Sequence, residues 1–253
     1  MSAETIIKKN CLPENFLVTA QLLFPSAKLS GVMLEIAELC DLLSDAALRG
    51  EWLTDDEWER LSSFKLAKRH DEWLGGRICT KLAAGKLLQL KAQQQYRELV
   101  VVNAVDGRPS LQPPESMKKE LDISISHSGN LAVAMVADHF CGVDIQKTVD
   151  TLLRVRERFC TTSEEDILSS AMNATAGAAE LNLLWTAKEA IRKALSFIRV
   201  PDFLGLNLSG IKAMSDDYYI FDFSYKNQSI RTLCGAYQNY CLALCLYRGS
   251  TDA

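Results

Sequence analysis

One acid in the C-terminal part of the chain is placed where it could do chemistry. Glu189 lies in the segment LLWTAKEAIRKAL (183–195), off the apolar stripe of an amphipathic helix. An i,i+4 pair with Lys193 on a solvated face is the simplest interpretation, and it contributes only a few tenths of a kcal/mol. Trp185 and Phe197 also lie off the stripe, however. This face is therefore expected to contact something, with the other half of the protein as the natural candidate.

A second acid follows a run of apolar residues. In GVDIQ (142–146), Val143 and Ile145 point to one side of a predicted strand, and Asp144 and Gln146 point to the other. A carboxylate in such an apolar sheet is costly unless its charge is compensated. A capping or salt-bridging role is one solution, and a hard cation is another. If Asp144 faces Glu189, the two carboxylates could share a metal.

Two nucleotide-binding motifs and the spacing of zinc ligands are absent from the sequence, and this narrows the kind of metal that is expected. The chain has neither a G-x-x-x-x-G-K-[ST] loop nor a G-x-G-x-x-G fingerprint, and its three histidines are not spaced like zinc ligands. Oxygen ligands without a histidine–cysteine cluster favour Mg²⁺, which keeps several waters and binds substrate phosphates. The expected ligand is therefore a phosphate compound.

The bases that could surround such a ligand are concentrated in one stretch. Residues 60–97 hold nine lysines and arginines against two acids, although the whole chain carries a net charge of −4. A local anion site and a solvated helix face both explain such a run. The overall negative charge argues against a general affinity for nucleic acid or for an anionic membrane.

Composition and length place the chain among ordinary globular proteins. It has 253 residues, of which 48% are hydrophobic and 24% charged. The eight cysteines form no C-x-x-C pair, which favours buried, reduced thiols in a cytoplasmic protein. No signal peptide and no apolar stretch of membrane-spanning length is present, and a monomer is expected.

The pattern of strands and helices predicts two α/β halves of an α+β protein. Thr54 has the features of a helix N-cap, followed by acids in the first turn. We predict a boundary near residues 112–120, which gives an N-terminal half 1–115 and a C-terminal half 116–253. The remaining elements are predicted as strands at 15–24, 98–103, 122–128, 131–138, 142–146 and in three later segments, and as helices at 31–49, across 54–90, at 150–170 and at 177–197.

Three blocks in this order resemble the Sfp-type 4′-phosphopantetheinyl transferases. They are ISISHSGNLAVAMV (123–136), GVDIQ and WTAKEAIRKAL (185–195), with WLGGR (73–77) and the GRP turn (107–109) in support. The resemblance implies a pseudo-twofold fold of two similar halves with coenzyme A at their interface. It also implies transfer of 4′-phosphopantetheine from coenzyme A to a serine of an acyl- or peptidyl-carrier protein, in fatty acid, polyketide, nonribosomal peptide or lysine synthesis.

The resemblance also implies roles for individual residues. Asp144 and Glu189 look like the Mg²⁺ carboxylates, with Glu189 as the candidate base and Lys193 beside the reacting phosphate. The candidate coenzyme A-binding residues are Arg69, Arg77, Arg108, Ser126, His127 and Lys188.

One position departs from the family pattern. Where many relatives have a second acid two residues after the aspartate, this chain has Gln146, whose amide can supply a neutral oxygen or hold a metal-bound water. Two rival functions therefore stay open. One is a non-catalytic module that binds carrier proteins or coenzyme A, and the other is a Mg²⁺-dependent phosphohydrolase.

Overall fold

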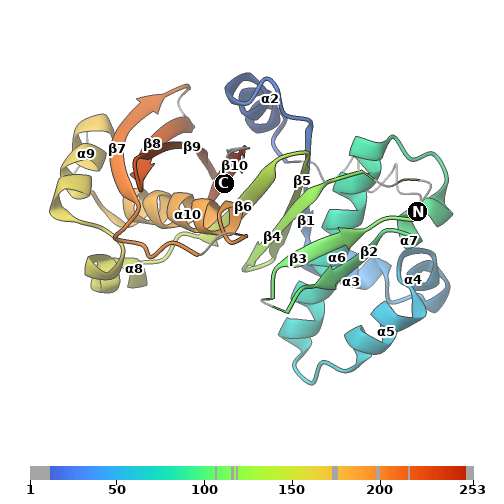
Figure 1. The fold of residues 1–253 in the computed structure, drawn as a ribbon. Coiled ribbons are helices and arrows are strands. Elements are labelled where there is room, and N and C mark those ends of the chain that lie inside the picture. Colours follow the sequence, from blue (N-terminus) through green and yellow to red (C-terminus); the bar gives the residue numbers. More distant parts are fainter. Residues whose placement is uncertain are drawn as a thin grey trace. The chain divides into compact units, whose positions relative to one another are not determined.

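The chain forms two compact units in the computed structural model, which describes residues 12–105, 107–114, 117, 119–172, 176–197, 200–215 and 217–248. Unit 1 comprises Met1–Leu17 and Ser26–His139, and unit 2 comprises Val18–Pro25 and Phe140–Ala253. The division thus lies later than the predicted boundary at residue 115. The reason is that the strand at 131–137 pairs with the strand at 29–35 on one side and with the strand at 122–128 on the other, which keeps all three in unit 1. The predicted α+β class is confirmed (Figure 1).

Unit 1 is built around an antiparallel sheet in the order β1-β5-β4. The long helix α6 packs on this sheet and contacts all three strands. A two-stranded ribbon, β2-β3, lies beside β4. The elements are β1 (Leu29–Glu35), α3 (Ile36–Leu42), α4 (Ala46–Trp52), α5 (Asp55–Ser62), α6 (Ala67–Leu88), α7 (Gln93–Arg97), β2 (Val100–Asn103), β3 (Pro109–Gln112), β4 (Asp122–Ser128) and β5 (Leu131–Ala137).

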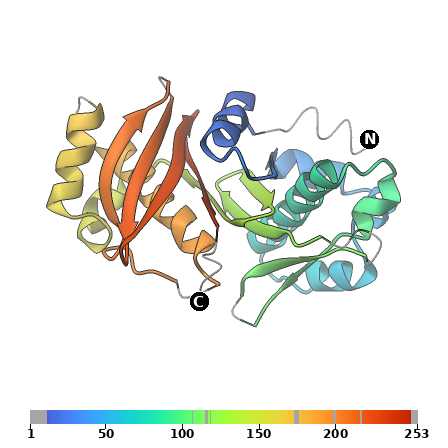
Figure 2. The same ribbon diagram turned by 45° about the horizontal axis from the view of Figure 1, so that its top comes forward.

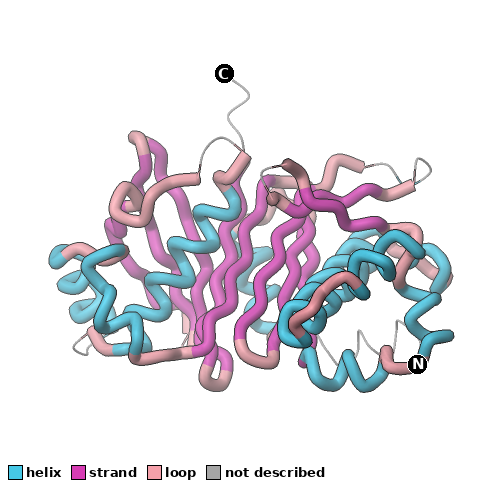
Figure 3. The backbone as a smooth tube through the Cα atoms, turned by 90° about the horizontal axis from the view of Figure 1, so that it is seen from below, coloured by secondary structure: helices cyan, strands magenta, loops and turns pink. Residues whose placement is uncertain are grey.

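Unit 2 contains a five-stranded antiparallel sheet in the order β6-β10-β9-β8-β7 (Figure 2). Helix α10 lies on β6, β10 and β9, and α9 contacts β7. In Figure 3 these helices appear in cyan beside the magenta strands. The elements are β6 (Phe140–Lys147), α8 (Thr151–Val155), the 3₁₀ helix η2 (Arg156–Arg158), α9 (Thr162–Met172), α10 (Ala178–Ala194), β7 (Asn207–Ala213), β8 (Tyr218–Tyr225), β9 (Gln228–Tyr237) and β10 (Tyr240–Tyr247).

Two predictions near the N-terminus were wrong. Residues 15–24 form helix α2 (Glu14–Leu23), in which Phe16 and Ala20 are buried one turn apart while Val18 and Leu22 are exposed. The start of the predicted helix 31–49 is instead strand β1. Its residues pair with the wholly buried β5, and this pairing outweighs the local helical pattern.

The strands predicted at 122–128, 131–138 and 142–146 are present, but these three neighbours in the sequence do not share one sheet. β4 and β5 pair with each other in unit 1, whereas β6 pairs only with β10 in unit 2. β7 was missed, because NLSGIKA lacks a long apolar run. The pseudo-twofold relation of the halves stays a prediction.

Each unit fastens its long helix through a buried glutamate. In unit 1 this glutamate is Glu57, and we call its contacts with Thr54, Lys81 and Val101 network 1. Glu57 closes a capping box with Thr54 at the start of α5. Its Oε2 accepts a hydrogen bond from Lys81 Nζ on α6 at 2.7 Å, and its Oε1 accepts one from the backbone N–H of Val101 on β2 at 3.5 Å. The capping box confirms the helix start predicted at Thr54.

Network 2 in unit 2 has the same parts. Glu164 bonds reciprocally with Thr161 at the start of α9, and the Lys188 ammonium on α10 lies 2.7 Å from its Oε1. The backbone N–H of Leu208 on β7 donates to the same oxygen at 2.9 Å. Lysine follows glutamate by 24 residues in both networks, and the strand residue follows by 44. The two units therefore repeat one arrangement, which no short sequence motif reveals.

The cysteines are free thiols in the part of the chain that the structure describes. Burial raises the pKa of Cys241 to about 11 and that of Cys245 to about 12, so neither is a thiolate at neutral pH. No helix among the described residues has the length and apolar character needed to cross a membrane.

Candidate functional site

The carboxylate predicted on β6 faces helix α10. Gly142, two residues before Asp144 and on the same face of the strand, has no room for a side chain, since a Cβ there would lie 1.8 Å from Ala190 O. This close approach seats the helix directly on the strand. Asp144 is consequently buried, 7% exposed, against the C-terminal turns of α10. Lys193 Nζ donates to Asp144 Oδ1 at 2.8 Å and to Val143 O at 3.0 Å.

Glu189 pairs with Arg192 and not with Lys193, the partner considered for a surface i,i+4 pair. Arg192 Nη1 donates to Glu189 Oε1 at 2.9 Å, while Lys193 is engaged by Asp144. Burial is the main cause that raises the pKa of Glu189. The positive charge of Arg192 partly offsets this, and the negative charge of Asp144 adds to it. The two predicted metal carboxylates are therefore close enough to repel each other.

The aromatic face of α10 contacts its own unit. Trp185 stacks on Phe203 with ring centroids 4.4 Å apart and meets Phe159 edge-on, and Phe197 stacks on Phe140. Arg192 also lies over the Phe203 ring and donates to Pro201 O. The predicted contact of this face is therefore made within unit 2 for these rings, by Phe159 and Phe203 on Trp185 and by Phe140 of β6 on Phe197.

The oxygen donors fit a hard divalent cation. Asp144 and Glu189 would supply two carboxylates, and Gln146 is half-buried on the same face of β6. Its amide nitrogen donates to Lys147 O at 3.0 Å. Within the described residues, no three or more histidine, cysteine, aspartate or glutamate side chains gather into a metal-binding group. Two carboxylates with waters completing the shell are nevertheless typical of Mg²⁺.

Lys188 is not placed to bind a ligand in this structure. Its side chain has no exposed surface, and its ammonium donates to Phe159 O, Glu164 and Phe203 O. An ammonium has three protons, and these acceptors account for all of them. The prediction that Lys188 contacts coenzyme A is therefore corrected to a buried role in network 2. Its i+1 neighbour Glu189 remains accessible.

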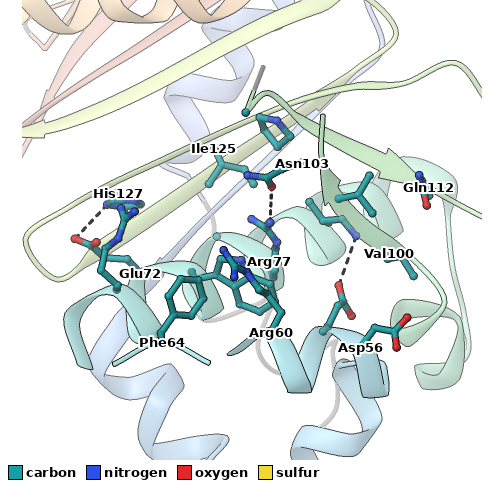
Figure 4. A pocket seen from close by; sticks show the side chains of 18 residues that line it. Asp56, Arg60, Phe64, Glu72, Arg77, Val100, Asn103, Gln112, Ile125 and His127 are labelled. Carbon is teal, nitrogen blue, oxygen red and sulfur yellow. Dashed lines mark hydrogen bonds and ion pairs between the residues drawn. The ribbon is translucent and has the colours of Figure 1, made fainter. Parts of the chain in front are cut away.

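Unit 1 contains a separate cavity of about 670 Å³ (Figure 4). Its wall combines positive side chains, aromatic rings and the edge of β2. Three of the predicted coenzyme A residues, Arg69, Arg77 and His127, line it. Further lining residues, which sequence reasoning did not single out, are Arg60, Phe64, Trp73 and Asn103. The concentration of bases in residues 60–97 was the signal for Arg60, whereas nothing in the sequence pointed to Asn103.

Arg77 is the most unusual group in this cavity. It is 8% exposed, its Nη2 donates to Asn103 Oδ1 at 2.7 Å, and its guanidinium lies 4.5 Å from the centre of the Trp73 ring. Its Nε has no hydrogen-bond partner among the described residues. Burial lowers the pKa of Arg77 to about 10, although the charge of Glu57 opposes this, so the group stays cationic at neutral pH. A buried cation with an unused donor is suited to an anion.

The remaining predicted residues of unit 1 divide between the cavity and its surroundings. His127 lies across the cavity wall from Arg77, with Nδ1 3.3 Å from Glu72 Oε1. Ser126 is buried and, as the next residue of β4, points to the opposite face of the strand. Arg108 follows the cavity-lining Gly107 and forms an ion pair with Asp122. The serine and histidine of the S-H pair are thus not brought together on one surface.

Comparisons with known proteins give one family and two solved structures. The family described as the 4′-phosphopantetheinyl transferase superfamily matches residues 140–245, a range that includes Asp144, Glu189 and Lys193. No curated protein matches the chain.

Both solved structures cover less than half of the chain. A holo-(acyl-carrier-protein) synthase from Bacillus anthracis str. Ames in complex with CoA (3′,5′-ADP) is 24% identical, with a TM-score of 0.38 over 44% of this chain and 93% of that one. An apo-ACPS structure from Chronobacterium ammoiniagenes is 20% identical, with a TM-score of 0.39 over 44% of this chain and 95% of that one.

Proposed function

Residues 140–245 belong to the 4′-phosphopantetheinyl transferase superfamily, and from this premise we propose that the protein moves 4′-phosphopantetheine from coenzyme A to a serine hydroxyl of an acyl- or peptidyl-carrier protein. The other product is adenosine 3′,5′-bisphosphate. The observation that carries the proposal is that Lys193 of α10 binds Asp144 of β6 and that the negative charge of Asp144 also acts on Glu189, with all three residues inside the matched range.

The proposed chemistry assigns separate tasks to the side chains of unit 2. Asp144 and Glu189 would hold Mg²⁺, with Gln146 beside them, and the ion would supply positive charge for the pyrophosphate. Lys193 stabilises the phosphate that leaves. Glu189 accepts the proton of the carrier serine, directly or through a water.

The cavity in unit 1 supports a nucleotide role for this unit. Arg77 offers an unpaired donor on a buried guanidinium, and Arg69 and His127 line the same wall. Trp73 and Phe64 offer aromatic surface of the kind on which a base can stack. We assign the 3′-phosphate of coenzyme A to the basic side of this cavity.

A reaction with apo-carrier proteins tests the transfer. The protein is incubated with coenzyme A, Mg²⁺ and a panel of apo-carriers, and each carrier is weighed by intact mass spectrometry. We expect one carrier to gain a single phosphopantetheine, and a serine-to-alanine version of that carrier to gain none. A carrier that binds without a mass change would support the binding-module alternative. Adenosine bisphosphate released from coenzyme A without any carrier would support the phosphohydrolase.

The nucleotide assignment has its own test. Arg77→Met and His127→Ala should weaken coenzyme A much more than 3′-dephospho-coenzyme A in calorimetry, since a charge-assisted phosphate contact contributes about 1.5–3 kcal/mol. Lys68→Met is the matched control, because Lys68 is on the same helix but its side chain is 80% exposed. Equal losses for both ligands would remove Arg77 and His127 from this role.

A further inference from the structure

Network 2 joins more of unit 2 than any stability role requires. Glu164 and Lys188 connect the start of α9, the middle of α10 and strand β7. Through the Phe159 and Phe203 carbonyls, the same ammonium also holds the two loops that pack on Trp185. The side chains of Glu164 and Lys188 are buried, so the network fixes the rotation and the axial position of α10 relative to these segments.

The energetics of such a pair favour a role beyond stability. Removing two charges from water costs several kcal/mol per ion, and buried ion pairs can often be replaced by apolar residues with no loss of stability. A network of this kind occurs in each unit, however, with the same residue types at the same spacing. Geometric precision is the property that a satisfied buried network supplies and that an apolar contact supplies less well.

In both units the fastened lysine is close along its helix to a candidate site residue. Glu189 follows Lys188 directly, and the next turn of α10 carries Lys193, which reaches Asp144. In unit 1, Arg77 lies one helical turn before Lys81, and Glu57 itself lines the cavity that Arg77 enters. A displacement of either helix would therefore move a carboxylate in one unit and a guanidinium in the other.

We propose that Glu57 and Glu164 are equivalent positioning residues. Glu164, acting through Lys188, fixes Glu189 against Asp144, and Glu57, acting through Lys81, fixes Arg77 in the cavity of unit 1. This inference rests on the proposed function for the identity of the ligands, a divalent cation for unit 2 and an adenosine bisphosphate for unit 1. Glu164 is buried in the core of unit 2, and Glu57, although it lines the cavity, is engaged by Lys81 and by the backbone of Val101, so each is proposed to act through its network.

The test is a crossed comparison of two matched variants. Glu164→Gln and Glu57→Gln keep the size of the side chain and remove its charge. Binding of Mn²⁺ is followed by electron paramagnetic resonance without nucleotide, and binding of adenosine 3′,5′-bisphosphate by calorimetry without metal. We expect Glu164→Gln to weaken Mn²⁺ about tenfold and leave the nucleotide within twofold. Glu57→Gln should do the reverse. Glu165→Gln, in a half-exposed ion pair on α9, should change neither.

If a glutamine variant does not fold, two substitutions that disturb the networks less can test the proposal. Thr161→Ala and Thr54→Ala remove the hydroxyl that accepts from the glutamate N–H and donates to the glutamate Oε2 in each network, and the same crossed pattern is expected at about threefold. If both ligands weaken equally in each variant, or if neither does while the melting temperature falls, the networks only stabilise the fold and the proposal is overturned. A wild-type protein that binds neither Mn²⁺ nor the nucleotide would overturn the proposed function, and this inference with it.

Discussion

Units 1 and 2 seat their long helices in opposite ways. In unit 1 the position without a side chain is on the helix, since a Cβ at Gly75 of α6 would lie 2.9 Å from the Ala132 methyl on β5. In unit 2 the position without a side chain is on the strand, at Gly142 of β6, where a Cβ would collide with the helix backbone at Ala190. Because the strand has no side chain at this position, the helix can carry larger side chains nearby. α10 can therefore present Glu189 and Lys193 beside Asp144.

The residues after the two buried lysines complete the contrast. Leu82 follows Lys81 and is fully buried in the core of unit 1, whereas Glu189 follows Lys188 and remains partly exposed. The residue after the network lysine is thus an apolar core residue in unit 1 and the proposed catalytic carboxylate in unit 2. In each unit the network fixes where the helix lies, and the residues next to the buried lysine decide what the helix does there.

The largest effect should come from breaking either network. Lys188→Met and Lys81→Met each leave a buried glutamate without its cation, and we expect the free energy of unfolding to fall by about 3–5 kcal/mol in both. Urea unfolding followed by circular dichroism measures this. The double variant Lys188→Met/Glu164→Leu removes both charges and should recover most of the loss. A loss below about 1 kcal/mol for either single variant would contradict the shared role of the networks.

The next prediction compares the two glycine contacts. Gly142→Ala should lower the free energy of unfolding by about 3 kcal/mol, because its methyl group meets backbone that cannot give way. Gly75→Ala should cost less, about 1–2 kcal/mol. There the obstacles are the Ala132 methyl at 2.9 Å and the Ile36 side chain at 3.3 Å, and alanine favours a helix over glycine by about 1 kcal/mol. Thermal unfolding of both variants checks the order, and equal losses would show that the two contacts do not differ.

A third prediction concerns the two carboxylates of unit 2 that are proposed to hold the cation. Glu189→Gln should reduce the rate of transfer at saturating Mg²⁺ at least 100-fold, which corresponds to about 2.7 kcal/mol. Asp144→Ala should do the same. Stability should change by only about 1 kcal/mol in Glu189→Gln, since its ion pair with Arg192 is partly exposed. If Asp144→Ala abolishes the thermal transition, the aspartate serves packing rather than transfer.

The smallest expected effect concerns the amide at position 146. Gln146→Glu adds one negative charge near the proposed cation, and the attraction is largely offset by the cost of dehydrating the new carboxylate. A net gain of about 1 kcal/mol should lower the Mg²⁺ concentration for half-maximal activity several-fold. The saturated rate should stay within about threefold. A Mg²⁺ titration that is unchanged in this variant would place the cation away from residue 146.

The sequence by itself determined much of the site in unit 2. The alternation of GVDIQ placed Asp144 and Gln146 on one face of a strand, and the spacing of this block to WTAKEAIRKAL gave the resemblance to the family that matches residues 140–245. The capping box at Thr54 was also readable, because its residues are three positions apart and interact within one helical turn. Local geometry and short motifs were sufficient for these features.

Tertiary structure alone decided the rest. Lys188 belongs to the same motif as Glu189, yet only the fold shows that it points into the core, where a glutamate 24 residues earlier neutralises it. β1 was hidden in a helical pattern because its strand character comes from β5, about 100 residues later. Ser126 and His127 are adjacent in sequence, but the strand turns them to opposite faces. In each case the deciding energy is burial and pairing with a distant partner, which short-range sequence patterns do not contain.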